Sequence, residues 1–296
     1  MVDLRDGEWL DDNRANWDER VPVHLARGFY DQGPLRAGGT VLDPIVAREI
    51  AGLYPEGLDG LRVLHLQCHF GSDTLSLAQL GASVVGIDFS RPAVQEARRM
   101  AAELDLPTSA CFIEANIYDA RHILPEPESF DLVFTMWGTI GWLPDVAEWA
   151  RIIAWFLKPG GVLYFADGHP AAFVFDGDGG PGRMPEFTFP YASTEPDVLD
   201  DPGDYADPDA VLEYGRTWEW CIRSRRCTRL SVTPASPSTR CASTSRCRSP
   251  CSRCWWETTR GCGRGRTARG CRCRTRWSRA DPASEPTSRF GCTGAP

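Results

Sequence analysis

Two stretches of the sequence contain residue types at a spacing that could bind a nucleoside. The first is Leu64-His-Leu-Gln-Cys-His-Phe-Gly71 and the second is Val84-Val-Gly-Ile-Asp88, so that a carboxylate follows Gly71 by 17 residues. A carboxylate at the end of a buried strand can accept hydrogen bonds from both hydroxyls of a ribose. Main-chain N–H groups of a turn that ends in glycine can face the rest of the ligand. The two stretches therefore predict a nucleoside site.

A β-α-β unit would position these residues. The apolar run at residues 62–66 suits a buried strand. A helical pattern opens at Gly71 or Ser72, continues to Leu80 and stops at Gly81. Residues 82–87 form a second apolar run, which ends on Asp88. The turn and the carboxylate thus lie at the carboxyl ends of neighbouring strands.

Strands and helices continue to alternate further along the chain. Further strands are expected at 110–114, 130–135 and 161–166, and further helices from about Pro92 past Arg99, capped by Ser90, and from Pro144 to before Lys158. This order predicts an α/β fold, with a Rossmann-like, doubly wound and mostly parallel sheet of five readable strands. Ligands bind such sheets at the carboxyl ends of the strands.

The chain divides into four segments. Residues 1–60 form a helical cap, 61–170 the nucleoside-binding domain, 171–220 an insertion on the substrate side that is rich in Gly, Pro and Asp, and 221–296 a tail. Within the cap, helices are expected around residues 13–20 and from 43 or 44 to 53. They either pack on the edge of the sheet or form a lid whose Trp17 or Tyr30 closes over the ligand.

The tail differs sharply in composition from the rest of the chain. Residues 1–220 have a net charge of −22, whereas residues 221–296 carry 17 arginines, 3 acids and 10 of the 12 cysteines. The cysteine spacing invites a zinc-ribbon interpretation and the arginines a nucleic-acid interpretation. With one Ile, one Leu and one Val, however, the tail has too little apolar surface to fold, which predicts disorder.

Several motifs together resemble class I S-adenosylmethionine-dependent methyltransferases. They are the strand–turn–helix–acid order, Phe130-Asp-Leu-Val and Leu157-Lys-Pro-Gly-Gly, which follow one another at the family's spacing. The first motif is similar to that of a bacterial branch that reads like Leu64 to Gly71. The resemblance extends over about residues 13–220 and includes Trp142-Leu-Pro-Asp145. It implies S-adenosyl-L-methionine as cofactor and methyl transfer (EC 2.1.1.-) to a small molecule.

The resemblance also implies roles for individual residues. Gly71 would let the backbone approach the cofactor, Asp88 would bind the ribose, and Asn116 would accept from the adenine amino group. His65, Gln67 and His69 depart from the family pattern of one acid and two glycines, and Gln67 or a backbone carbonyl would replace the missing acceptor near the methionine ammonium. The residues expected to contact the cofactor are Tyr30, His65, Gln67, Cys68, His69, Gly71, Asp88, Phe89, Asn116, Ile117, Thr135 and Met136.

Other interpretations of these residues stay open. His65 could be a buried core histidine, and a metal trio of His65, Cys68 and His69 lacks further ligands nearby. His169 follows the fifth strand, where a general base would be useful. A nucleotide-binding module without catalysis is one alternative function. An NAD-dependent oxidoreductase is disfavoured because Gly-x-Gly-x-x-Gly is absent after the first strand.

The partners and compartment follow from the same features. No run approaches the ~20 apolar residues of a membrane span, and the amino terminus has no apolar signal-peptide core. We therefore expect a cytoplasmic protein with a small-molecule substrate, no metal, no membrane partner and no nucleic-acid partner.

We predict that the codons after about Trp220 are read out of frame. When each codon is shifted back by one nucleotide, every cysteine codon becomes Leu, Met or Val. Trp255 and Trp256 are then forced to leucine and valine, so the tail regains apolar character. Sequencing of the gene around the Trp220 codon should reveal an inserted or deleted nucleotide. An intact frame there, or stoichiometric zinc in the purified protein, would contradict the prediction.

Overall fold

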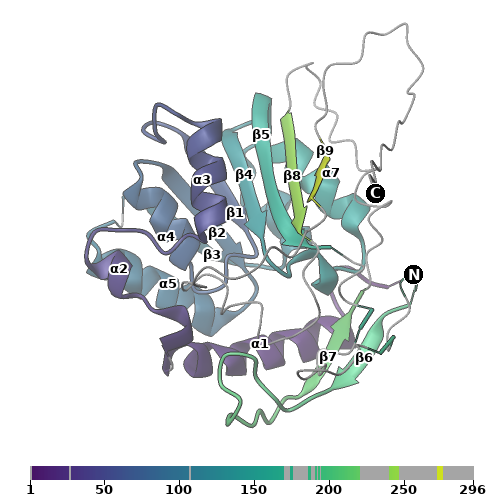
Figure 1. Ribbon diagram of the computed structural model, residues 1–296. Coiled ribbons are helices and arrows are strands. Elements are labelled where there is room, and N and C mark those ends of the chain that lie inside the picture. Colours follow the sequence, from purple (N-terminus) through teal and green to yellow (C-terminus); the bar gives the residue numbers. More distant parts are fainter. Residues whose placement is uncertain are drawn as a thin grey trace, which may run out of the picture.

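The computed structural model is built around one sheet with strand order β3-β2-β1-β4-β5-β8-β9 (Figure 1). The structure describes residues 2–26, 28–106, 108–169, 174–175, 186–187, 191, 193 and 195–220, and the backbone of 240–246 and 272–275. The first five strands are β1 (Arg62–Leu66), β2 (Ser83–Asp88), β3 (Ala110–Glu114), β4 (Phe130–Met136) and β5 (Leu157–Gly168). They pair in parallel, which confirms the predicted Rossmann-like α/β fold.

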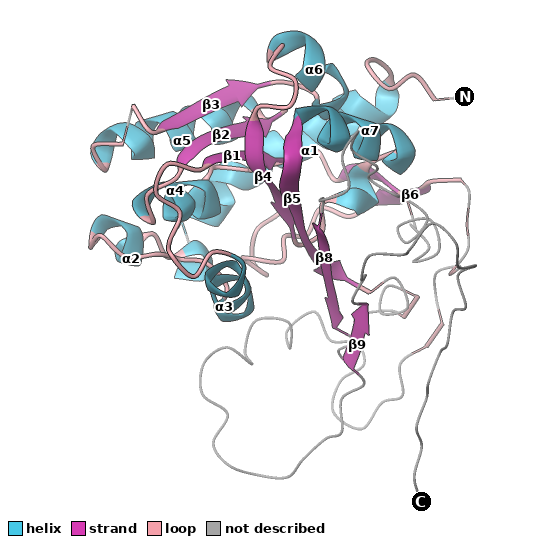
Figure 2. Cartoon of the chain, turned by 90° about the horizontal axis from the view of Figure 1, so that it is seen from above, coloured by secondary structure: helices cyan, strands magenta, loops and turns pink. Residues whose placement is uncertain are grey.

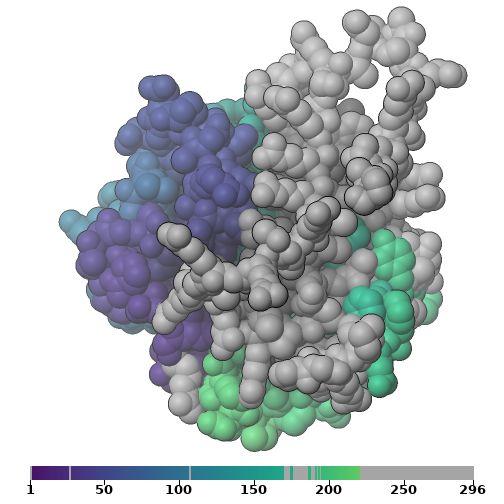
Figure 3. All heavy atoms as spheres, viewed as in Figure 1, coloured from purple at the N-terminus to yellow at the C-terminus, as the bar shows by residue number. Residues whose placement is uncertain are grey.

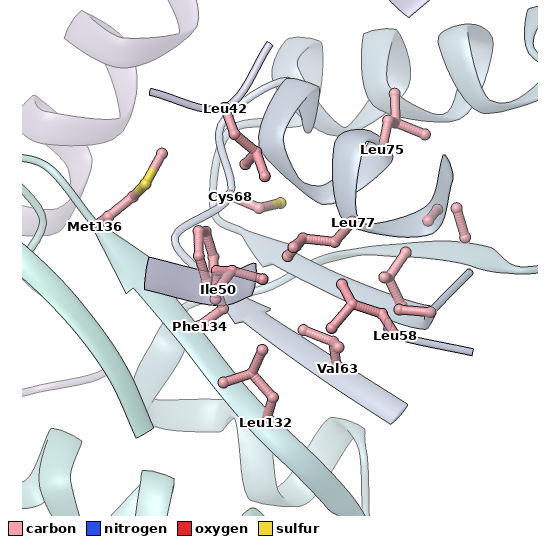
Figure 4. Packing of buried hydrophobic residues seen from close by; sticks show 14 of the residues in the cluster. Leu42, Ile50, Leu58, Val63, Cys68, Leu75, Leu77, Leu132, Phe134 and Met136 are labelled. Carbon is pink, nitrogen blue, oxygen red and sulfur yellow. The ribbon is translucent and has the colours of Figure 1, made fainter. Parts of the chain in front are cut away.

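Helices cover both faces of this sheet. One face packs against α3 (Pro44–Leu53), α4 (Ser72–Gln79) and α5 (Arg91–Glu103). Figure 4 shows the apolar side chains of this layer, with Ile50, Leu75 and Leu77 over Val63, Leu132 and Phe134 of the sheet. The other face packs against α7 (Val146–Phe156), α6 (Ala120–Ile123) and the first turn of α1 (Glu8–Ala26). Burial of both faces explains why the strands read as continuous apolar runs.

Side-chain caps set where two of the helices begin. The Ser90 hydroxyl accepts the Ala93 N–H at 3.3 Å at the start of α5, as the sequence predicts. The carboxylate of Asp145 accepts the Glu148 N–H at 2.9 Å, so α7 begins one residue after Asp145 rather than at Pro144. Short turns complete the layer as η1 (Gly28–Tyr30), α2 (Gly33–Arg36), η2 (Ile117–Asp119) and η3 (Ile140–Trp142).

Two strands extend the sheet beyond the five that were predicted. β8 (Arg240–Arg246) pairs in parallel with β5, and β9 (Arg272–Thr275) pairs antiparallel with β8 (Figure 2). The apolar content of the tail gave no sign of them. Their pairing covers the backbone N–H and C=O groups along the edge of β5. These two stretches are therefore strands, whereas disorder was predicted for the whole tail. For the remaining residues of 221–296 the prediction of disorder lies outside the described residues.

The segment predicted as an insertion contains an antiparallel strand pair. β6 (Asp197–Asp200) pairs with β7 (Arg216–Glu219), and β7 packs along α1. Figure 1 shows α1 crossing beneath the carboxyl ends of the parallel strands, with β6 and β7 beside it, and Figure 3 shows the same two segments side by side in purple and green. Within the described part of the chain, no helix combines the length and apolar character that crossing a bilayer requires.

Gly71 is a position in the cofactor-side turn where the fold leaves no room for a side chain. It has φ +78°, and a Cβ there would lie 2.6 Å from Phe112 Cε1. We expect Gly71→Ala to lower the free energy of unfolding, measured by urea denaturation, by about 1–3 kcal/mol for overpacking. The left-handed backbone adds roughly 1 kcal/mol.

Gly38→Ala is the matched control for this substitution. Gly38 has φ +80° but no heavy atom within 4 Å of its Cβ position, so it isolates the backbone cost. Equal losses in the two variants would contradict the packing argument.

Candidate cofactor site

The turn between β1 and α4 adopts an unusual backbone conformation. Gln67 and His69 have φ +59° and +51°, and Gly71 follows with +78°. Left-handed conformations are costly for residues with a Cβ. Two main-chain hydrogen bonds fix the turn, from Cys68 N–H to Ile87 O at 3.1 Å and from Gly71 N–H to Cys68 O at 2.9 Å. The turn is thus tied to the neighbouring strand β2.

Asp88, the last residue of β2, completes this attachment. Its Oδ2 accepts the His69 N–H at 2.7 Å and its Oδ1 accepts the Ser90 N–H at 2.9 Å. Burial raises the pKa of Asp88 to about 6, although the hydrogen bonds from Ser90 and His69 act to lower it. A buried carboxylate with a pKa raised in this way is typical of a ligand-binding position.

A cavity of about 460 Å³ opens between this turn, the ends of β2 and β4, and α1. The predicted cofactor residues that line it are Tyr30, His65, Gln67, Cys68, His69, Gly71, Asp88, Phe89, Asn116, Ile117 and Met136. The remaining one, Thr135, is buried beneath the lining, where its hydroxyl donates to Thr139 Oγ1 at 3.2 Å. His169 follows the end of β5 and is not among the lining residues.

His65 is part of the core as well as of the cavity wall. Its Nδ1 lies 2.7 Å from Thr74 Oγ1, and its ring packs edge-on against Phe134. Burial lowers the pKa of His65 to about 3, so the ring is uncharged at neutral pH. This geometry favours the interpretation of His65 as a buried, hydrogen-bonded core histidine. Among the residues that the structure describes, no three His, Cys, Asp or Glu side chains are arranged to hold a metal ion.

Gln67, a residue of the cavity wall, has an unused acceptor. Its Nε2 donates to Thr139 O at 2.7 Å, whereas its Oε1 is buried without a hydrogen-bond partner. The loop that contains Thr139 is fixed in turn by Asp167, whose Oδ1 accepts the N–H groups of Gly138 and Gly168, each at 2.7 Å. The amide of Gln67 is therefore held with its oxygen available, and a buried acceptor of this kind calls for a ligand donor.

Asn116 holds the opposite end of the cavity. Its Oδ1 accepts the Tyr118 N–H at 3.1 Å, and its Nδ2 donates to Leu4 O at 2.8 Å. A carbonyl oxygen has two lone pairs, so Oδ1 can still accept one further hydrogen bond. Phe89 and Ile117 lie beside it in the cavity wall and provide apolar surface.

The sequence analysis missed Asp73, which also lines the cavity. Asp73 lies in the first turn of α4, and its pKa is raised to about 7 by burial and by the nearby carboxylate of Asp43. An acid in the first turn of a helix ordinarily stabilises the helix dipole, so the sequence gave no reason to single it out. The position of Asp43 across the cavity is visible only in three dimensions.

The amino-terminal helix forms one wall of the cavity and is bound to the β6–β7 region. Asn13 donates to Trp218 O at 2.9 Å and accepts the Trp218 N–H at 2.8 Å. Asp204 accepts from Arg20 at 2.8 Å and lies 3.1 Å from His24 Nε2. Trp17 and Tyr30 both line the cavity, so these two aromatic side chains of the amino-terminal segment lie beside the site.

Comparison with known proteins identifies the class to which this fold and cavity belong. Residues 63–161 match the family described as "Methyltransferase domain". The chain is 37% identical to the ubiquinone biosynthesis O-methyltransferase of Ralstonia nicotianae over 118 residues, which cover 40% of this chain and 48% of that protein. It is 33% identical to the enzyme of that name from Xanthomonas campestris pv. campestris over 157 residues, or 51% of this chain and 61% of that protein.

A solved structure shows a weaker likeness. Geranyl diphosphate C-methyltransferase from Streptomyces coelicolor A3(2) is 18% identical, with a TM-score of 0.40, over 52% of this chain and 64% of that one. The chain spans about half the length of the curated relatives that it matches. The family match and the sheet order 3-2-1-4-5 agree. Residues 63–161 belong to the class I S-adenosyl-L-methionine-dependent methyltransferases, which confirms the resemblance seen in the sequence.

Proposed function

We propose that this chain binds S-adenosyl-L-methionine in the cavity and transfers its methyl group to a hydroxyl of a small molecule. The observation that carries the proposal is Asp88, a buried carboxylate at the end of β2 that holds the β1–α4 turn and lines the cavity. The names of the relatives from Ralstonia and Xanthomonas support oxygen as the methylated atom.

The nucleoside end of the cavity suits the adenosine part of the cofactor. The two ribose hydroxyls would donate to Asp88, and each such hydrogen bond to a charged group contributes about 1.5–3 kcal/mol. Adenine would lie between the apolar side chains of Phe89 and Ile117, with its amino group donating to Asn116 Oδ1. All three residues line the same end of the cavity, which supports this orientation.

The other end of the cavity suits the methionine part. Gln67 Oε1 is buried and unpartnered, and Asp73 lines the same wall. Both would accept from the methionine ammonium, in place of the acid that the first motif lacks. Bound in this way, the cofactor supplies an electrophilic methyl carbon. The protein's task is then to align the acceptor with that carbon and to exclude water.

The lid and the insertion would define the substrate side. Trp17 from α1 and Tyr205 from the insertion line the cavity opposite the turn, which supports the assignment of 171–220 to substrate binding. We infer a small-molecule substrate and a cytoplasmic location for the chain. We likewise infer the four-segment division, with the frame change after about residue 220.

Calorimetry of the full chain with S-adenosylhomocysteine and with NAD tests this function. We expect S-adenosylhomocysteine to bind and Asp88→Ala to weaken its binding by about 1.5–3 kcal/mol, because the ribose hydroxyls lose a charged acceptor. Glu114→Gln, at the end of β3 and outside the cavity, is the matched control. Tight NAD binding would favour an oxidoreductase. Cofactor binding without methyl transfer to any hydroxyl compound would favour the non-catalytic module.

The affinity for S-adenosylhomocysteine should fall as the pH is lowered. Asp88 and Asp73, with pKa values of about 6 and about 7, must be ionised to accept from the ligand, so protons compete with binding. Between about pH 8 and about pH 5 we expect at least a tenfold loss, measured by calorimetry. Asp88→Asn should remove the phase near pH 6 and Asp73→Asn the phase near pH 7. A flat profile in the wild-type protein would contradict these roles.

A further inference from the structure

His69 reaches both halves of the cavity. Its main-chain N–H bonds to Asp88 at the nucleoside end, while its imidazole lies among the side chains of the lid. The ring centroids of Trp17, His24, Tyr30 and Phe70 lie 5.4, 5.2, 5.9 and 4.1 Å from that of His69. The His69 ring is thus placed between the proposed cofactor and the aromatic residues on the substrate side.

Two imidazole nitrogens at this point have no partner. His69 Nε2 and His24 Nδ1 are both buried without a hydrogen bond. The second nitrogen of His24, Nε2, lies 3.1 Å from Asp204 Oδ2, which also accepts from Arg20. An unpaired buried nitrogen is costly, and His69 belongs to the cavity wall, so a polar ligand group there would give its Nε2 a partner.

The surrounding groups decide the state of the His69 ring. Burial and the neighbouring His24 lower the pKa of His69 well below its usual range, whereas Asp204 acts to raise it. The groups that face it are Arg20 and His24 from α1, Tyr30 from η1, Asp88 from β2, and Asp204 and Tyr205 from the insertion. A ring that is neutral at rest can accept a proton.

We propose that His69, supported by His24 and Asp204, accepts the proton of a phenolic hydroxyl during methyl transfer. The inference rests on the proposed function. The substrate O–H bond breaks and its proton goes to His69 Nε2 while the oxygen bonds to the methyl carbon. The carbon–sulfur bond breaks with its electron pair left on sulfur. One positive charge leaves sulfur and one appears on the imidazole, so the total charge of the buried cavity does not change.

The walls around His69 indicate the class of substrate. Trp17, Tyr30, Trp142 and Tyr205 line this part of the cavity, and their rings suit a planar aromatic molecule. Of the described lining residues none is a lysine or arginine, whereas Asp31, Asp43 and Asp73 are acids. A phenol without a carboxylate or phosphate therefore fits better than an anionic aromatic compound.

Two other groups could in principle accept the proton. Asp73 is assigned above to the cofactor ammonium, and Tyr30, whose hydroxyl lies 2.6 Å from that of Tyr205, has a pKa raised well above its usual value by burial. His169, which the sequence suggested as the base, lies outside the cavity lining. Replacement of Asp73 or of His169 therefore gives a result distinct from replacement of His69.

The test uses 4-nitrocatechol, whose absorbance reports its own ionisation, bound to the full chain in the presence of saturating S-adenosylhomocysteine. We expect His69→Asn to raise the pH at which the bound probe ionises by about one unit or more, because the imidazolium that takes the proton and stabilises the bound phenolate is lost. Asparagine tolerates the positive φ of this position. Asp204→Asn should shift the pH at which the bound probe ionises less, in the same direction. Exposed His122, replaced by glutamine, is the matched control and should leave it unchanged.

A second readout is transfer of radiolabelled methyl to catechol, which should fall roughly 100-fold in His69→Asn. The same loss in His169→Gln or Asp73→Asn but not in His69→Asn would overturn the assignment. Failure of both catechol and 4-nitrocatechol to bind, the latter measured below the pH at which it ionises, would overturn the phenol class. The affinity for S-adenosylhomocysteine is measured first in the wild type and in every variant. Absence of S-adenosylhomocysteine binding to the wild-type chain would count against the proposed function alone.

Histidine NMR of the wild-type chain covers the case in which the variant does not fold. One of the five histidines should take up a proton on its imidazole when 4-nitrocatechol binds to the complex with S-adenosylhomocysteine. An unchanged histidine spectrum would overturn the proposal.

Discussion

The hydrogen bond from the His69 main chain to the Asp88 carboxylate is the interaction on which the site depends. It fixes a turn in which two residues with side chains, Gln67 and His69, hold left-handed backbone conformations. Such conformations cost of order 1–3 kcal/mol each and persist where the surroundings enforce them. The family pattern has glycines at both positions. In this chain the side chains of Gln67 and His69 line the cavity instead.

The position of α1 depends on contacts between distant parts of the sequence. Asn13 and Trp218 are 205 residues apart and pair through both hydrogen-bonding groups of the Trp218 backbone. Trp220, the last residue before the composition changes, donates its N–H to Gly141 O at 2.6 Å beside the cavity. The described lining residues all precede residue 206. A change of reading frame after Trp220 would therefore leave every described part of the site encoded.

The sequence predicted the framework of the fold well because its signals are local. The strands 62–66 and 110–114 agree with β1 and β3 residue for residue, and Ser90 caps α5 as its type and position indicate. Buried parallel strands read as short apolar runs, and caps are read from neighbouring residues. β8 was missed because its pairing satisfies the edge of β5 without any apolar pattern of its own.

The site was predicted less completely because part of it is assembled by long-range packing. Eleven of the twelve residues expected to contact the cofactor line the cavity, whereas Asp73, Thr139 and Tyr205 were brought to it only by the fold. His24 and Asp204 are 180 residues apart, and no local pattern links them. The family pattern likewise cannot show that Gln67 Oε1 lacks a partner, since this depends on where Thr139 lies.

The most direct measurement is a crystal structure of the full chain with S-adenosylhomocysteine. We expect the ribose hydroxyls on Asp88, the adenine between Phe89 and Ile117, and the ammonium near Gln67 Oε1 and Asp73. A ligand bound elsewhere, or one whose ribose makes no contact with Asp88, would contradict this expectation.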